Sequence, residues 1–170
     1  MSVAAWVAIG WLGVTLTTAL GARLGVSHVM PDAAVVTIVF LAFRRHPAQV
    51  VLVALALGYL SGRQALAPVG LHEVALILCA LTVYFGAGNL AGSGARFFAL
   101  TSGGAVMLYH LLVYLLASSL GGRAHFAGWG TATLLPTGLI TALLALVAEA
   151  PMAAIERRLS PSEHEELSWH

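Results

Sequence analysis

The long uncharged runs of the chain constrain its fold most strongly. From residue 3 to residue 20 there is no charged side chain, and further apolar runs follow along the sequence. About 20 apolar residues in a helix span the hydrocarbon core of a bilayer, because each residue rises about 1.5 Å. These runs predict an all-α, polytopic bundle of transmembrane helices.

The composition favours the same fold class. Of the 170 residues, 59% are hydrophobic and 9% are charged. A soluble domain carries about 25% charged residues, because its surface faces water. A compact soluble chain of this length cannot hide so much apolar surface, so the lipid bilayer must act as its solvent. The net charge of +1 gives no strong attraction to nucleic acid.

Polar turns rich in glycine, proline and arginine divide the chain into six apolar segments. We expect helices at about residues 3–22, 31–43, 48–61, 71–90, 97–120 and 130–159. Residues 1–159 then form a single transmembrane helical domain. Residues 160–170 form a short acidic cytoplasmic tail, which is too short and too polar to fold alone.

The second segment leaves the topology open. Pro31 suits the first turn of a helix, where its missing N–H is not needed, and Asp32 follows it. The uncharged part of this segment, residues 33–43, is short for a full crossing. Either residues 26–30 extend it, or it is a partial span that neighbouring helices shield from lipid.

The distribution of arginine favours one orientation. If all six helices cross, one side holds five arginines and the other holds three. Cytoplasmic loops carry the excess of basic residues, which places both termini in the cytoplasm. If the second segment does not cross, the termini lie on opposite sides. The five arginines are Arg44, Arg45, Arg96, Arg157 and Arg158, and the three are Arg23, Arg63 and Arg123.

Two ionisable residues lie inside expected helices. His110 is well inside the fifth, where a polar group is costly and often functional. A neutral histidine is also satisfied by one hydrogen bond, for which Tyr109 or Tyr114 is a partner. Glu149 lies in the sixth helix, and either reaches the interface, pairs with an arginine, or handles protons.

The motifs of known catalytic and metal sites are incomplete in this sequence. His72 and Glu73 begin a zinc-protease pattern, but the second histidine is replaced by Leu76. Gly92-Ser93-Gly94 lacks the spacing of a nucleophile elbow and is better explained as a turn. We therefore expect no catalytic, metal or cofactor site, and hence no enzyme.

Small residues four positions apart occur in three segments. They are Gly58 with Gly62, Gly88 with Gly92, and Ala4 with Ala8. Such pairs allow helix backbones to approach closely, so they are candidates for helix packing or for partner contacts in the membrane. The two glycine pairs lie near helix ends, where glycine also serves as a cap.

The chain resembles the rod-shape-determining protein MreD family along nearly its whole length. Met30-Pro31-Asp32 opens the second apolar segment, as in that family. The run from Phe40 to Arg45 is similar to the family's short helix with a basic turn, and Pro68-Val69-Gly70-Leu71-His72 to its later helix start. The final helix is similar at Leu135-Pro136, Thr141-Ala142-Leu143, Pro151 and Arg157-Arg158-Leu159.

This resemblance implies a non-enzymatic scaffold of the bacterial inner membrane. Members associate with MreC, a periplasmic protein with one membrane helix. With MreC they belong to the elongation machinery of MreB filaments, a peptidoglycan glycosyltransferase and a transpeptidase. The resemblance therefore implies a role in cell-shape maintenance and peptidoglycan synthesis, with Pro31 and Asp32 among the candidate partner contacts.

Two other functions stay open. The substrate-binding component of energy-coupling-factor vitamin transporters is also a six-helix protein of similar length, and MreD-like proteins resemble its fold. Its vitamin site would have to be built from the few polar residues near one membrane surface, namely His28, Asp32, Arg63, Gln64 and Arg123. The third function is an intramembrane enzyme centred on His110 or Glu149.

Overall fold

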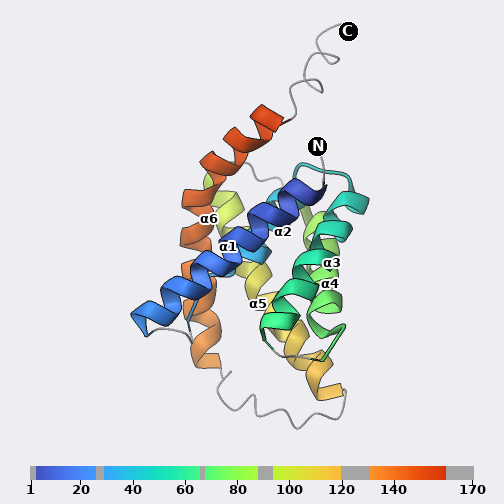
Figure 1. The fold of residues 1–170 in the computed structure, drawn as a ribbon, viewed down its shortest axis with the longest axis vertical. Coiled ribbons are helices and arrows are strands. Elements are labelled where there is room, and N and C mark those ends of the chain that lie inside the picture. Colours follow the sequence, from blue (N-terminus) through green and yellow to red (C-terminus); the bar gives the residue numbers. More distant parts are fainter. Residues whose placement is uncertain (1–2, 26–28, 66–67, 88–93, 120–130, 160–170) are drawn as a thin grey trace, which may run out of the picture.

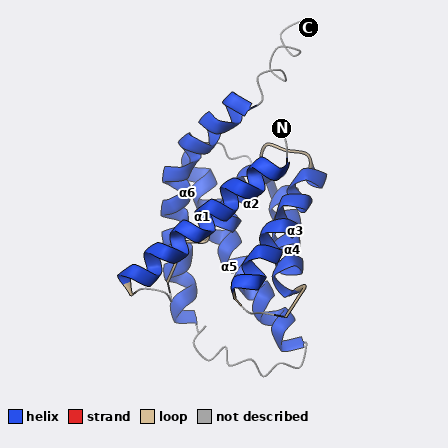
Figure 2. Ribbon diagram, viewed as in Figure 1, coloured by secondary structure: helices blue, strands red, loops and turns tan. Residues whose placement is uncertain are grey.

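The computed structural model describes residues 3–25, 29–65, 68–87, 94–119 and 131–159. Within these ranges helices joined by turns and loops make up the chain, without a strand (Figure 2). The predicted helical fold class is confirmed. The six helices are α1 (Val3–Leu24), α2 (Ala33–Ala42), α3 (Pro47–Gln64), α4 (Leu71–Ala87), α5 (Ala95–Ser119) and α6 (Thr131–Leu159).

Three of these helices are long and apolar enough to cross a membrane. They are Val3–Leu24, Ala95–Ser119 and the part of α6 from Thr133 to Arg158. α2 has ten residues, which is about 15 Å and half of a bilayer core. The helix alone is therefore too short for a full crossing, which agrees with the partial span that neighbouring helices shield, while residues 26–28 of the alternative extension lie outside the described residues.

α2 lies at the centre of the bundle. All ten of its residues are buried, and it contacts each of the other five helices. Asp32 is the N-cap, and its side chain accepts a hydrogen bond from the N–H of Val35 at 3.0 Å. The expected helix start at Pro31 was wrong, because Asp32 caps the helix and its first residue is Ala33.

The other helices form two hairpins with α2 between them. α3 packs on α4, α5 packs on α6, and α4 also contacts α5. α1 runs obliquely across α2 and α3 (Figure 1). The first residues of α1 and the last residues of α6 lie at the same end of the bundle (Figure 1). We call this the termini end; the turn between α2 and α3 and the start of α5 also lie there.

Glycine allows a close contact between α3 and α4. A Cβ atom added to Gly58 in α3 would lie 2.6 Å from the Cα of Glu73 in α4. Gly62, one turn later, faces His72 at an ordinary contact distance of 3.6 Å. Both predicted packing glycines of α3 thus face α4 of the same chain. Gly88 and Gly92, the second predicted pair, lie outside the described residues.

Two further close contacts were not anticipated from the sequence. In α5 a Cβ on Gly103 would lie 3.0 Å from the carbonyl oxygen of Gly138 in α6. In α1 a Cβ on Gly10 would lie 2.7 Å from a methyl group of Leu57 in α3. By contrast, Ala4 and Ala8 of α1 are both exposed on the outside of the bundle. Close backbone approach therefore holds both hairpins together.

We expect Gly58→Ala to lower the free energy of unfolding by about 1–3 kcal/mol, because the new methyl group meets backbone that cannot rotate away. Gly104→Ala is the matched control, since nothing lies within 4 Å of a Cβ at that helical position. Thermal unfolding of the purified protein in detergent measures both. Equal midpoints for Gly58→Ala and wild type would contradict the close α3–α4 contact.

Candidate functional site

A cluster of polar residues lies inside the bundle where α2 and α4 begin. We call it the buried polar centre. Asp32 precedes α2, His72 and Glu73 are in the first turn of α4, and the remaining members come from the middle of α5 and α6. The centre consists of Asp32, His72, Glu73, Tyr109, His110 and Thr141.

Direct contacts connect these residues across four elements. Nδ1 of His72 and the hydroxyl of Tyr109 share a hydrogen bond of 2.6 Å. The Tyr109 ring also contacts the ring of His110, with their centroids 5.3 Å apart. The backbone N–H of Asp32 donates to Oγ1 of Thr141 at 3.1 Å. The start of α2 is thereby fixed to α6, and the start of α4 to α5.

The carboxylate of Asp32 influences most of the centre. While it caps α2, it also interacts electrostatically with His72, Tyr109 and His110. The first turn of a helix carries partial positive charge, which favours a carboxylate there. Asp32 therefore stabilises the helix start and adds a negative charge that attracts a proton on either histidine.

Glu73 is the least satisfied member of the centre. The residue is 8% exposed, and its Oε2 atom has no hydrogen-bond partner among the described residues. A buried carboxyl oxygen without a partner is costly and unusual in native structures. Its place in the first turn of α4 supplies favourable dipole interactions.

The side chains of the buried polar centre can form hydrogen bonds and interact through their charges inside an apolar bundle. Ionisable residues in such positions commonly mark functional sites in membrane proteins. Within the described ranges there is no group of three histidine, cysteine or acidic residues placed to hold a metal ion. These side chains are best suited to bind a polar group of a ligand or to hold a proton.

A second polar region lies at the termini end and consists of two arginines and two glutamates. Nη1 of Arg44 and Nη2 of Arg45 lie 3.0 and 3.1 Å from the two carboxylate oxygens of Glu156. Nη2 of Arg44 lies 3.8 Å from Glu149. These ion pairs connect the α2–α3 turn to α6. Of the interpretations considered for Glu149, pairing with an arginine is the one that the geometry shows.

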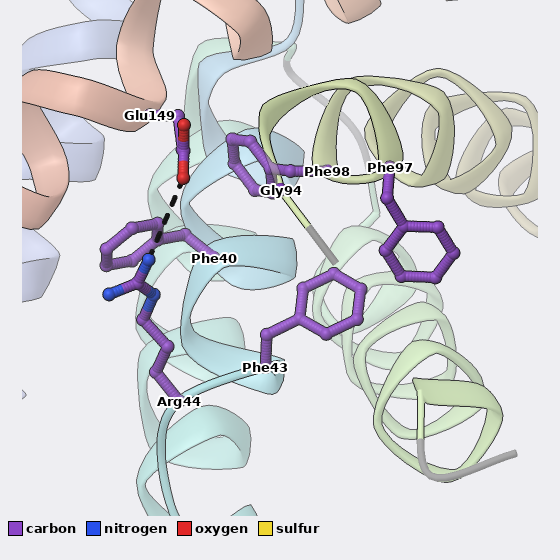
Figure 3. A pocket seen from close by; sticks show the side chains of 7 residues that line it. All are labelled: Phe40, Phe43, Arg44, Gly94, Phe97, Phe98 and Glu149. Atoms are coloured by element: carbon purple, nitrogen blue, oxygen red, sulfur yellow. Dashed lines mark ion pairs between the residues drawn. The ribbon is translucent and has the colours of Figure 1, made fainter. Parts of the chain in front are cut away.

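A cavity of about 230 Å³ opens beside this ion-pair network (Figure 3). Four phenylalanine rings from α5 and from the end of α2 form most of its wall. Arg44 and Glu149 lie on one side of it, and Gly94, which precedes α5, on another (Figure 3). The guanidinium of Arg44 also lies over the ring of Phe40, 4.6 Å from its centroid. The phenylalanines are Phe40, Phe43, Phe97 and Phe98.

Sequence reasoning found some of these residues and missed others. It singled out Asp32, His110 and Glu149, and proposed Tyr109 or Tyr114 as the partner of His110. The structure directs the Tyr109 hydroxyl to His72 instead, and Tyr114 is exposed. The missed Glu156 lies seven residues, two helical turns, after Glu149, and this spacing places both on the face that meets Arg44.

The polar residues proposed for a vitamin site are not brought together among the described residues. Arg63 and Gln64 are exposed at the end of α3, whereas Asp32 belongs to the buried polar centre. His28 and Arg123 lie outside the described ranges.

We expect Tyr109→Phe to lower the free energy of unfolding by about 1–2 kcal/mol, because it leaves the buried Nδ1 of His72 without its hydrogen bond. Tyr114→Phe is the matched control, since that side chain is 54% exposed. Thermal unfolding in detergent compares the two. The same loss in both variants would mean that the hydroxyl of Tyr109 contributes nothing specific.

Comparisons with protein-family models, curated proteins and solved structures gave no match to this chain. The roles of the buried polar centre and of the cavity therefore rest on their own geometry and chemistry.

Proposed function

We propose that the chain is a multi-pass scaffold of the bacterial inner membrane that supports cell elongation and peptidoglycan synthesis. Its partner in this role is an MreC-like protein with a single membrane helix. The support is the sequence resemblance to the MreD family, together with three helices long and apolar enough to cross a membrane. In this proposal the helices lie in the bilayer as one bundle, similar in form to vitamin-transporter binding subunits, and the termini end faces the cytoplasm.

The outer face of α1 is the observation that carries the proposal. Of the 18-residue apolar stretch of α1, only 17% is buried inside the protein, against 39% for the stretch in α5 and 22% for that in α6. Ala4 and Ala8 lie on this exposed face, followed at the same spacing by Leu12 and Leu16. Two small residues one turn apart leave a shallow surface where a second helix backbone fits closely. A partner with one membrane helix matches this surface.

We expect Ala8→Leu to reduce co-isolation of the single-helix partner by about tenfold or more, because the larger side chain separates the helix backbones. Ala150→Leu is the matched control, because Ala150 is exposed on α6. Pull-down from membranes quantifies the partner, and cell shape gives an independent measure. Retention of the partner in Ala8→Leu would show that α1 does not bind it.

A second function is favoured by the buried polar centre. A binding subunit for a small solute needs a few convergent polar groups in an apolar surround, and His72, Tyr109 and Asp32 converge in this way. A stoichiometric small molecule that co-purifies with the wild type, and is lost in Tyr109→Phe, would favour the transporter subunit over the scaffold.

A further inference from the structure

The cavity at the termini end combines apolar walls with both signs of charge. Phenylalanine rings supply the walls, while Arg44 and Glu149 lie together at one side (Figure 3). Its volume of about 230 Å³ is below the range of about 300–1,000 Å³ that is typical of small-molecule pockets. The volume therefore suits part of a larger molecule better than a whole small-molecule ligand.

The two glutamates that face Arg44 are unequally satisfied. Glu156 contacts both Arg44 and Arg45 at 3.0–3.1 Å. Glu149 lies 3.8 Å from Arg44, and its side chain is 27% exposed. Charge-assisted hydrogen bonds are about 2.7–2.9 Å long, so the Arg44–Glu149 pair is loose. Glu149 consequently keeps acceptor capacity beside the cavity.

A second side of the cavity carries positive character. Gly94 lines the cavity and directly precedes α5, so the first N–H groups of that helix lie at this edge. A helix N-terminus carries partial positive charge and favours phosphate. Together with Arg44 it complements an anionic group, while Glu149 complements a cationic one.

We propose that this cavity binds phosphatidylethanolamine, a membrane phospholipid that has both charges in its headgroup. The ammonium group binds Glu149, and the phosphate lies between Arg44 and the start of α5. The upper part of one acyl chain packs on the phenylalanine rings. The bound lipid supplies Glu149 with the close donor that Arg44 does not give it.

A membrane lipid fits this place better than a dissolved solute. The cavity adjoins the apolar helices α5 and α6, both of which are long and apolar enough to cross a membrane. Arginine side chains commonly anchor membrane proteins at the membrane–water interface, and the proposal places that interface at the level of Arg44. The lipid headgroup would thus contact polar protein surface at the level of the interface. Its acyl chain would contact apolar protein surface deeper in the bilayer.

Native mass spectrometry tests the proposal on the full chain in mild detergent with equal amounts of phosphatidylethanolamine and phosphatidylglycerol. We expect the wild type to retain phosphatidylethanolamine preferentially. Glu149→Gln should reduce that preference about tenfold, because the ammonium group loses its charged acceptor. Glu73→Gln is the matched control, since Glu73 lies in the buried polar centre and does not line the cavity.

A second pair of variants tests the acyl-chain contact. Phe97→Trp enlarges a ring in the cavity wall and should lower retention of either lipid, whereas Phe85→Trp makes the same change on an exposed surface of α4. Circular dichroism establishes that each variant is folded. The proposal is overturned if the folded Glu149→Gln variant keeps the wild-type lipid preference, or if Phe97→Trp and Phe85→Trp retain lipid equally.

Discussion

The rest of the structure depends on the complete burial of α2. A ten-residue helix is too short to cross a bilayer, and its two ends leave backbone groups that lipid cannot satisfy. Five helices surround it. At its start Asp32 accepts from the N–H of Val35, and at its end the N–H of Arg45 donates to the carbonyl of Leu41 at 2.8 Å. The bundle therefore gives α2 the environment that lipid does not.

The two ends of α2 also connect the two polar regions of the molecule. Asp32 at one end belongs to the buried polar centre, with its histidines and Tyr109. Phe40 and Arg44 at the other end belong to the cavity and the ion-pair network. The two regions are thus about 15 Å apart along a helix of ten residues. A movement of α2 along its axis would be felt at both, because each end is fixed to α6, through Thr141 and Glu156 respectively.

Much of the fold could be predicted from the sequence, because helices in lipid appear in it as long apolar runs. Apolar runs separated by arginine, glycine and proline gave the position of every helix. The depth of α2 did not follow, since an apolar run of ten residues has the same composition whether it faces lipid or protein. The role of Asp32 as an N-cap was also missed, although an aspartate before an apolar run is a recognised sign of a helix start.

The candidate site was harder to predict, because its members come together only through tertiary contacts. His72 and Tyr109 are 37 positions apart, and Asp32 and Thr141 are 109 apart. No local spacing indicates such pairs. His110 attracted attention for its depth in the helix, whereas the hydrogen bond that joins His72 to α5 is made by its neighbour Tyr109. Small residues were recognised in α3, but the contact of Gly103 with Gly138 was missed, although Ala99 with Gly103 and Gly138 with Ala142 have the same four-residue spacing.

Labelling with a lipid-soluble, photoreactive carbene precursor in reconstituted bilayers tests the central claim most directly. Mass spectrometry of the digested protein gives the label carried by each helix. Burial of α2 behind five neighbours predicts strong labelling of α1 and α6 and almost none of residues 33–42. Labelling of α2 as heavy as that of α1 would show that lipid reaches it, and would contradict the central position on which both polar regions depend.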